Sequence, residues 1–383
     1  MNAKERIMRT LNGLETDRVA IYTMIPFALD GQNFMPGPFH GYRDYDDWRM
    51  LDEFYHKLTR RMQHECDNFF VWRASCMDAQ NLFIPEKYVK SINIEEKEGV
   101  AQRRFMVEAG GKTLSKTEGY KKGTGHTWVT EHFCKSADEA LSLLELDYKR
   151  PDCQSGELKN IKRDLGERGV VWVTIPSPIL AVCRLFDPQD FLLIYALEPQ
   201  KIKVLMDTAA QRIKENLISI LESGECDIVR FGGAEHATPP LMSPKDFDIL
   251  VYDYDKPLMD ICASYGTKIA VHCHGNIKHA LERFSQMGVD QTDPVESVPF
   301  GEVTLTQARK LTKSKITLTG NIQFSELVNE DMDYIKKRVN GIISEAGKKR
   351  LIITTSATPL EAITQKLYDN YNAMIDAVID YAD

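Results

Sequence analysis

Two histidines separated by one residue are the part of this sequence best suited to chemistry. They stand in the segment Val271-His272-Cys273-His274-Gly275-Asn276, which follows a short apolar run. A buried strand that ends in this way places imidazoles where the strand gives way to a loop. If the strand conformation continues, His272 and His274 project to one side and Cys273 to the other. Two neutral imidazoles would make half of a metal site.

A third ligand is sought in the preceding apolar segment, which ends close to Glu235 and His236. Zinc bound by His272, His274 and the Glu235 carboxylate would keep an open position for a substrate. The alternative is a site without metal, in which one histidine binds a loop carbonyl and the other binds an organic substrate. The H-x-H pattern is short and occurs often by chance, so the sequence leaves both interpretations open.

Buried strands separated by helices must position these residues. Strand patterns occupy residues 17–24, 67–73, 169–175, 226–233, 267–272, 288–293, 315–321 and 351–355. Several of them are continuously apolar, as expected for strands buried on both faces, and the pattern predicts an α/β fold of the (β/α)8 TIM barrel type. The second choice is an open doubly wound sheet. No G-x-G-x-x-G follows any strand, which disfavours that fold and predicts no nucleotide cofactor.

Three further segments complete the predicted single domain of residues 1–383. A capping box formed by Asn2 and Glu5 opens an N-terminal helix that stops at Gly13. Residues 85–135, after the second strand, predict a β-hairpin insertion with a Gly-Gly turn. The loop over residues 25–41 carries Phe27, Phe34 and Phe39, which either cover a flat ligand or pack over the mouth of the barrel.

Residues at the carboxyl ends of barrel strands form the site in proteins of this fold. Arg230 lies inside an apolar strand, so it needs an anionic partner: either a substrate group or, as we slightly favour, an internal Asp or Glu. Arg73, Asp290 and Asp293 pose the same choice. The predicted catalytic residues are Glu235, His272, His274 and Asp290. The predicted substrate-binding residues are Tyr22, Met24, Arg73, Arg230 and Asn321.

Composition limits the classes of partner. The chain has 383 residues and a net charge of −8, which disfavours binding to nucleic acid or to an anionic membrane. It contains no run of eighteen apolar residues and begins with a charged segment, so we expect a cytoplasmic protein. Its eight cysteines form no CxxC pair, which favours reduced thiols over disulfides. The sequence gives no evidence on oligomeric state.

Taken in order, several motifs resemble the uroporphyrinogen decarboxylase superfamily, which also contains cobalamin-dependent methyltransferases. The resemblance spans nearly the whole chain and implies a (β/α)8 barrel. Its motifs are Asp17-Arg18-Val19, Pro176-Ser177-Pro178, Leu241-Met242-Ser243-Pro244-Lys245-Asp246-Phe247, His272-Cys273-His274-Gly275-Asn276, Gly288-Val289-Asp290, Gly320-Asn321 and Thr358-Pro359-Leu360-Glu361.

The methyltransferase branch looks closer than the decarboxylases. Decarboxylases carry an arginine-bearing loop after the first strand, whereas residues 24–29 here contain no arginine. Methyltransferases carry H-x-C-G-N and a later cysteine as zinc ligands. His272 matches the first ligand, His274 stands in place of the cysteine, and residues 352–359 contain no cysteine.

The resemblance implies methyl transfer between a corrinoid protein and a small acceptor such as a thiol, with zinc as the implied metal. A second hypothesis is decarboxylation of uroporphyrinogen or another carboxylate, in which Arg73 and Arg230 hold carboxylates and Asp290 stabilises a protonated intermediate. A third is a non-catalytic barrel that binds a tetrapyrrole, a corrinoid or a partner protein.

Overall fold

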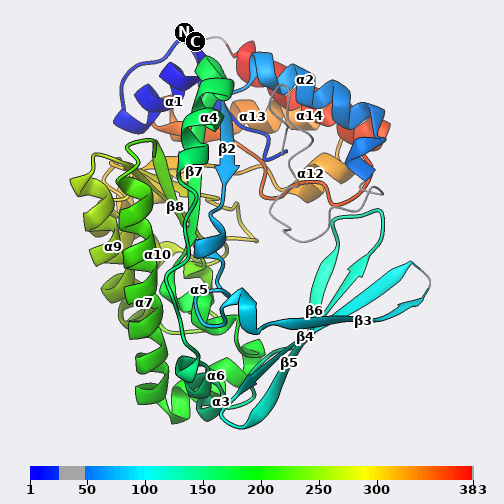
Figure 1. Cartoon of the computed structure of the whole chain (residues 1–383). Helices are drawn as coiled ribbons and strands as arrows, with labels where there is room; N and C mark the ends of the chain where they lie inside the picture. Colours follow the sequence, from blue (N-terminus) through cyan, green and yellow to red (C-terminus); the bar gives the residue numbers. More distant parts are fainter. Residues whose placement is uncertain (26–47, 98, 382–383) are drawn as a thin grey trace.

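An eight-stranded parallel sheet forms the centre of the computed structural model, which describes residues 1–25, 48–97 and 99–381 (Figure 1). The strand order is β1-β12-β11-β10-β9-β8-β7-β2. These strands are β1 (Ala20–Ile21), β2 (Asn68–Trp72), β7 (Gly169–Pro176), β8 (Ile228–Gly232), β9 (Lys268–His272), β10 (Gln291–Asp293), β11 (Thr317–Thr319) and β12 (Leu351–Ile353). The predicted (β/α)8 barrel is therefore confirmed.

Asp67 closes the barrel between its first and second strands. Its backbone N–H donates to the carbonyl of Ile21 (2.8 Å), and its carboxylate accepts from the N–H of the same residue (2.9 Å). The carboxylate also accepts from Arg6 at 2.6 Å and from Arg18 at 2.7 Å, and Asp67 is fully buried. Two guanidinium groups therefore neutralise the charge that this buried carboxylate brings to the seam.

Side-chain alternation along the strands decides which residues face the barrel interior. A buried inner cluster contains Ala20, Tyr22, Phe69, Val170, Trp172, Ile228, Ala270 and Ile352. Arg230 and His272 lie two positions after Ile228 and Ala270 and share this face, towards the carboxyl end of the barrel. Arg73 lies four positions after Phe69, just beyond the end of β2, and continues the same alternation. Asp293 pairs with His272 across β9 and β10 and so faces the same way.

The N-terminal helix α1 (Ala3–Asn12) covers the opposite end of the barrel. Asn2 caps it by accepting from the N–H of Glu5, and Gly13 ends it in the left-handed conformation (φ 67°), as the sequence predicts. Its Ile7 and Leu11 are fully buried and join the inner cluster. Figure 1 shows α1 at the end of the molecule away from the projecting strands.

The other helices surround the strands. They are α2 (Glu53–Glu65), α3 (Ala137–Ser142), α4 (Gly156–Leu165), α5 (Pro178–Cys183), α6 (Pro188–Leu197), α7 (Pro199–Leu221), α8 (Pro244–Phe247), α9 (Asp253–Ser264), α10 (Lys278–Met287), α11 (Leu305–Leu311), α12 (Phe324–Asn329), α13 (Met332–Ala346) and α14 (Gln365–Ile379). None of the helices within the described residues is long and apolar enough to cross a membrane.

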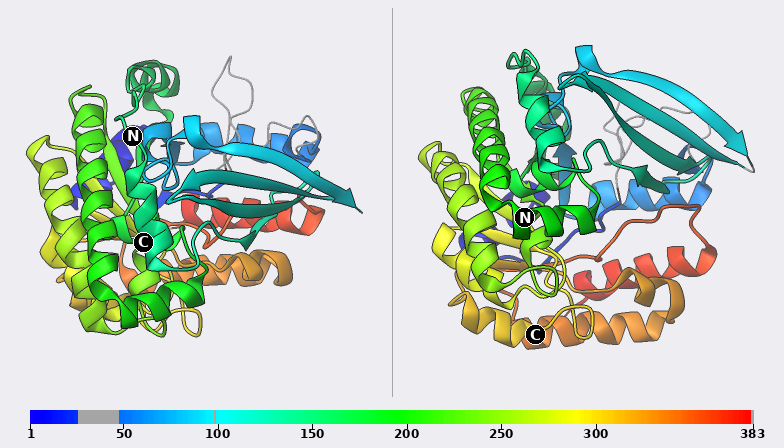
Figure 2. Two further views of the ribbon diagram at one scale, coloured as in Figure 1. Left: turned by 60° about the horizontal axis from the view of Figure 1, so that its bottom comes forward. Right: turned by 90° about the horizontal axis from the view of Figure 1, so that it is seen from below.

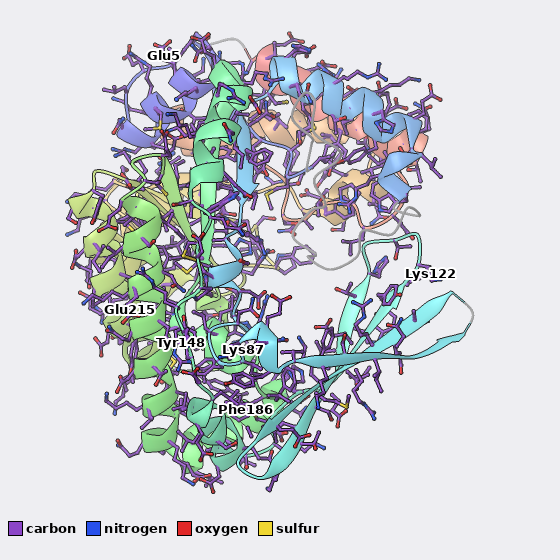
Figure 3. All side chains as sticks on the ribbon, viewed as in Figure 1. Glu5, Lys87, Lys122, Tyr148, Phe186 and Glu215 are labelled. Carbon is purple, nitrogen blue, oxygen red and sulfur yellow. A yellow bond between two sulfur atoms is a disulfide. The ribbon has the colours of Figure 1, made fainter. Side chains whose placement is uncertain are left out.

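The insertion after the second strand is larger than the predicted hairpin. It is a four-stranded antiparallel sheet of β3 (Lys90–Lys97), β4 (Val100–Ala109), β5 (Lys112–Lys121) and β6 (Thr127–Glu131). The hairpin expected at Gly110-Gly111 joins β4 to β5, and one further strand pairs on each side. The sheet extends away from the barrel in both views of Figure 2. In Figure 3, Lys122, which directly follows β5, lies far from Phe186.

One cysteine prediction is wrong. Cys76 and Cys153 form a disulfide, with their Cα atoms 5.2 Å apart, although 77 residues separate them in the sequence. The bond joins the short helix after β2 to the segment before α4. Sequence spacing could not find this pair because the fold alone brings the two cysteines together. The other six cysteines are free.

Asp255 of α9 gives the fold a pH dependence. Its carboxyl is fully buried and accepts from the Ser177 hydroxyl at 2.9 Å, while its second oxygen has no hydrogen-bond partner. Burial raises its pKa from 3.8 to about 7, against a smaller lowering by Ser177. Because the pKa of this carboxyl is raised in the folded state, its contribution to the free energy of unfolding is fully present below pH 3.8. This contribution is lost as the pH rises through about 7.

We predict that Asp255→Asn removes this dependence. Relative to the variant, the wild type should lose about 2 to 4 kcal/mol of unfolding free energy between pH 4 and pH 8. Urea unfolding across this range measures it. Asp260→Asn, at an exposed position of the same helix that pairs with Lys256, is the control and should follow the wild type. Parallel profiles for wild type and Asp255→Asn would contradict the prediction.

Candidate active site at the carboxyl ends of the strands

The carboxylate of Asp293 links two strand ends at the mouth of the barrel. Arg230 donates to it through Nε (3.1 Å) and Nη2 (2.7 Å), which makes a bidentate pair. The Nδ1 atom of His272 lies 3.1 Å from the same carboxylate. The exposed fraction of the Arg230 side chain is 8% and that of Asp293 is 2%. The guanidinium also lies over the Trp172 ring, 4.9 Å from its centroid.

This contact defines the tautomer of His272 when the ring is neutral. Asp293 is ionised, because the combined effect of Arg230 and His272 outweighs its burial and holds its pKa well below the usual range. An ionised carboxylate only accepts hydrogen bonds, so Nδ1 of His272 carries the proton. Burial first, and then the charge of Arg230, lower the pKa of His272. Its Nε2 therefore keeps a free lone pair.

The second imidazole lies beside the first. The strand ends at His272, yet the His274 ring meets it edge to face with centroids 4.6 Å apart, so the two histidines do share one side. Nδ1 of His274 lies 3.3 Å from Glu296, whose other oxygen accepts from the N–H of Gly275 at 2.8 Å. Burial acts to lower the pKa of His274, but Glu296 raises it overall. The pKa values of the two neighbouring imidazoles are thus shifted in opposite directions, down for His272 and up for His274.

Glu235 follows β8 in the short helix Ala234–Ala237. One of its carboxylate oxygens is buried and has no hydrogen-bond partner. This short helix contacts β9, the strand that ends at His272. Glu235 therefore lies beside the strand that carries His272, and its role as a ligand or catalytic residue stays a prediction.

The three predicted zinc ligands are not gathered into one group in the described part of the chain. Among the described residues, no three His, Cys, Asp or Glu side chains are grouped so that they could hold a metal ion. His272 and His274 instead each face a separate carboxylate, Asp293 and Glu296. Binding of zinc by His272, His274 and Glu235 stays a prediction, and the chemistry below uses no metal.

Other predicted substrate-binding residues fall into two groups. Tyr22 belongs to the inner cluster and Met24 packs against it, and the Tyr22 ring meets Phe69 and Trp172 edge-on. Asn321, in contrast, accepts from Arg338 of α13 through its side chain at 3.0 Å and through its carbonyl, which ties it to an outer helix.

Asp290 lies at the wrong end of the barrel for the mouth. It precedes β10, and its carboxylate binds Lys268 (2.8 Å) and the N–H of Ile269 (2.9 Å) at the amino ends of the strands. The structure thus separates it from His272. Asp293, three residues later, ends the strand and faces the interior. Both aspartates are visible in the sequence, but the exact bounds of β10 are needed to decide which of them lies at the mouth.

Glu296 was not singled out from the sequence. It lies in the loop after β10, and Asp293-Pro294 and Pro299 are the only signals near it, which mark a loop and not a function. Phe27, Phe34 and Phe39 lie outside the described residues, as does most of the loop that carries them.

The fold and the mouth residues together define a (β/α)8 barrel with a polar, partly charged site at its carboxyl end. Residues 119–381, well over half of the chain, match the uroporphyrinogen decarboxylase (URO-D) family. The chain therefore belongs to the URO-D family. No curated protein matches it.

Solved structures share the fold at low sequence identity. A methyltransferase from Methanosarcina mazei is 15% identical, and the superposition covers 99% of both chains with a TM-score of 0.62. A B12-independent methionine synthase from Shewanella is 12% identical over 61% of this chain and 67% of that chain, with a TM-score of 0.44. The first of these shows the same barrel over its full length.

Removal of the Asp293 charge tests the linked pairs. We predict that Asp293→Asn lowers the unfolding free energy by about 3 to 5 kcal/mol, because it leaves Arg230 buried without its counter-charge. Urea titration measures this loss. In the double variant with Arg230→Met the loss should be clearly smaller than the sum of the two single losses. Additive losses would mean that the two residues do not depend on each other.

Proposed function

We propose that this protein transfers a methyl group from a corrinoid protein to a small acceptor such as a thiol. The observation that carries the proposal is the geometry of His272. Asp293 accepts from its Nδ1, and Nε2 has no hydrogen-bond partner among the described residues. An imidazole oriented by a buried carboxylate is well suited to accept a proton from a bound substrate.

The reaction needs a deprotonated acceptor. Nε2 of His272 accepts the proton of the thiol, and Asp293 stabilises the imidazolium that results. The sulfur then attacks the methyl carbon. The sulfur–carbon bond forms as the bond from the methyl group to the corrinoid breaks, and the electron pair of the broken bond stays with the corrinoid. His274 and Glu296 border the same space and hold a second imidazole beside the reacting atoms.

The comparisons support the methyl-transfer branch only through the fold. The Methanosarcina methyltransferase has the same barrel over 99% of this chain. The corrinoid partner and the thiol acceptor are our proposals. The zinc implied by the resemblance is also a proposal, and no step above depends on it.

Decarboxylation of uroporphyrinogen or another carboxylated substrate is the alternative. It is favoured by Arg73, whose buried Nε has no hydrogen-bond partner and could hold a carboxylate. Release of carbon dioxide from uroporphyrinogen, with no methylation of a thiol, would identify this activity and overturn the proposal of methyl transfer.

Replacement of the proposed base should abolish most of the activity. We predict that His272→Gln lowers kcat/KM for methylation of 3-mercaptopropionate by methylcobalamin about 10²- to 10⁴-fold, as loss of a general base does. His279→Gln is the matched control. It removes an imidazole that also pairs with a carboxylate, Asp248, but on helix α10 and outside the mouth. The control should retain wild-type activity, and an equal loss in both variants would contradict the role of His272.

A further inference from the structure

Arg73 is a cation at the mouth of the barrel that has no fixed partner in the described part of the chain. It directly follows β2, and its Nε atom is buried with no hydrogen-bond partner. By the alternation of side chains along β2, Arg73 falls on the inner face with Phe69. In the register of the sheet, Trp72 pairs with Val173, so the next residue, Arg73, comes beside Thr174. Thr174 in turn pairs with Arg230. Arg73 and Arg230 therefore lie in one row across three strands.

Two other arginines whose burial is unfavourable have hydrogen-bond partners within the protein. Burial lowers the pKa of both Arg73 and Arg309 to about 10. The guanidinium of Arg309, however, donates to the carbonyls of Ala346, Ile316, Lys349 and Arg350. Arg212 donates to the carbonyl of Leu82 at 2.5 Å and lies over the Tyr148 ring, 3.9 Å from its centroid. Arg73 has no such contacts to described residues.

The carboxylates of Asp293 and Asp78 already have other partners. Asp293 binds Arg230 and His272, and Asp78 accepts from the N–H groups of Gln80 and Asn81 in its own turn. The neighbours that act most strongly on Arg73 are two other arginines, Arg230 and Arg184. Within the described residues, therefore, the positive charge of Arg73 is not neutralised.

We propose that Arg73 binds a single carboxylate of the methyl acceptor, which makes the acceptor a small monoanion. The identification of the ligand as the methyl acceptor rests on the proposed function, whereas the carboxylate site rests on the geometry of Arg73 alone. A planar guanidinium binds a carboxylate through two parallel hydrogen bonds, which would satisfy the buried Nε. One unpaired guanidinium matches one carboxylate, and Arg73 thereby selects an anionic thiol over a neutral one.

Binding of three small probes to the full chain tests the site without any methyl donor. Propionate supplies the carboxylate alone, 3-mercaptopropionate adds the thiol, and 2-mercaptoethanol lacks the carboxylate. Ligand-observed NMR titration gives Kd for each. Arg73→Gln should weaken both carboxylates about 10- to 100-fold and change 2-mercaptoethanol less than about threefold.

Two further variants interpret the result. Arg73→Lys keeps the charge but not the planar fork, so its affinity for propionate should lie between those of the wild type and Arg73→Gln. Arg212→Gln removes a half-buried arginine that has protein partners, and its affinity for propionate should equal that of the wild type. Arg73→Gln should fold at least as stably as the wild type, because it removes a half-buried charge that has no partner among the described residues.

Each outcome decides the inference. Selective loss of carboxylate binding in Arg73→Gln supports it, even if no methyl transfer is detected, in which case the proposed function fails and the carboxylate site stands. Equal affinity of wild type and Arg73→Gln for propionate overturns it. No propionate binding by the wild type, or an equal loss in Arg212→Gln, overturns it as well.

Discussion

The buried carboxylate of Asp293 is the group on which the mouth of the barrel depends. It neutralises Arg230, whose charge would otherwise lie inside an apolar strand, and it orients His272 through Nδ1. Either task alone would be ordinary in a protein core. Together they couple the stability of the barrel to the chemistry of its mouth, because one carboxylate both compensates a guanidinium and fixes which imidazole nitrogen remains free.

Charge is distributed unevenly around this carboxylate. Arg230 is paired with Asp293 and His274 with Glu296. Among the residues that the structure describes, Arg73 has no fixed partner and one buried oxygen of Glu235 is unsatisfied. A buried polar group that lacks a partner in the protein is satisfied by water, by an ion or by a ligand, or it has a catalytic role. The paired groups thus provide a rigid frame, and the unpaired ones mark where a substrate would make its contacts.

The sequence predicts the barrel well because its strands are apolar on both faces and its helices carry clear caps such as Asn2. It also identifies the histidine pair and Arg230 as strand-end residues, and it slightly favours the internal ion pair that the structure shows. The Asp290 prediction fails for a local reason, since a shift of three residues along β10 moves a carboxylate from one end of the barrel to the other. Glu296 and the Cys76–Cys153 bond depend on contacts between distant segments, which no local pattern reveals.

The most direct test of this account follows the methyl group itself. Protein is incubated with methylcobalamin carrying a ¹³C-labelled methyl group and with 3-mercaptopropionate, and the methyl signal is followed by NMR. The account predicts that the label leaves the cobalamin and is recovered as the S-methyl thioether, at a rate proportional to protein concentration. Label that remains on the cobalamin at the rate of a protein-free control would contradict it.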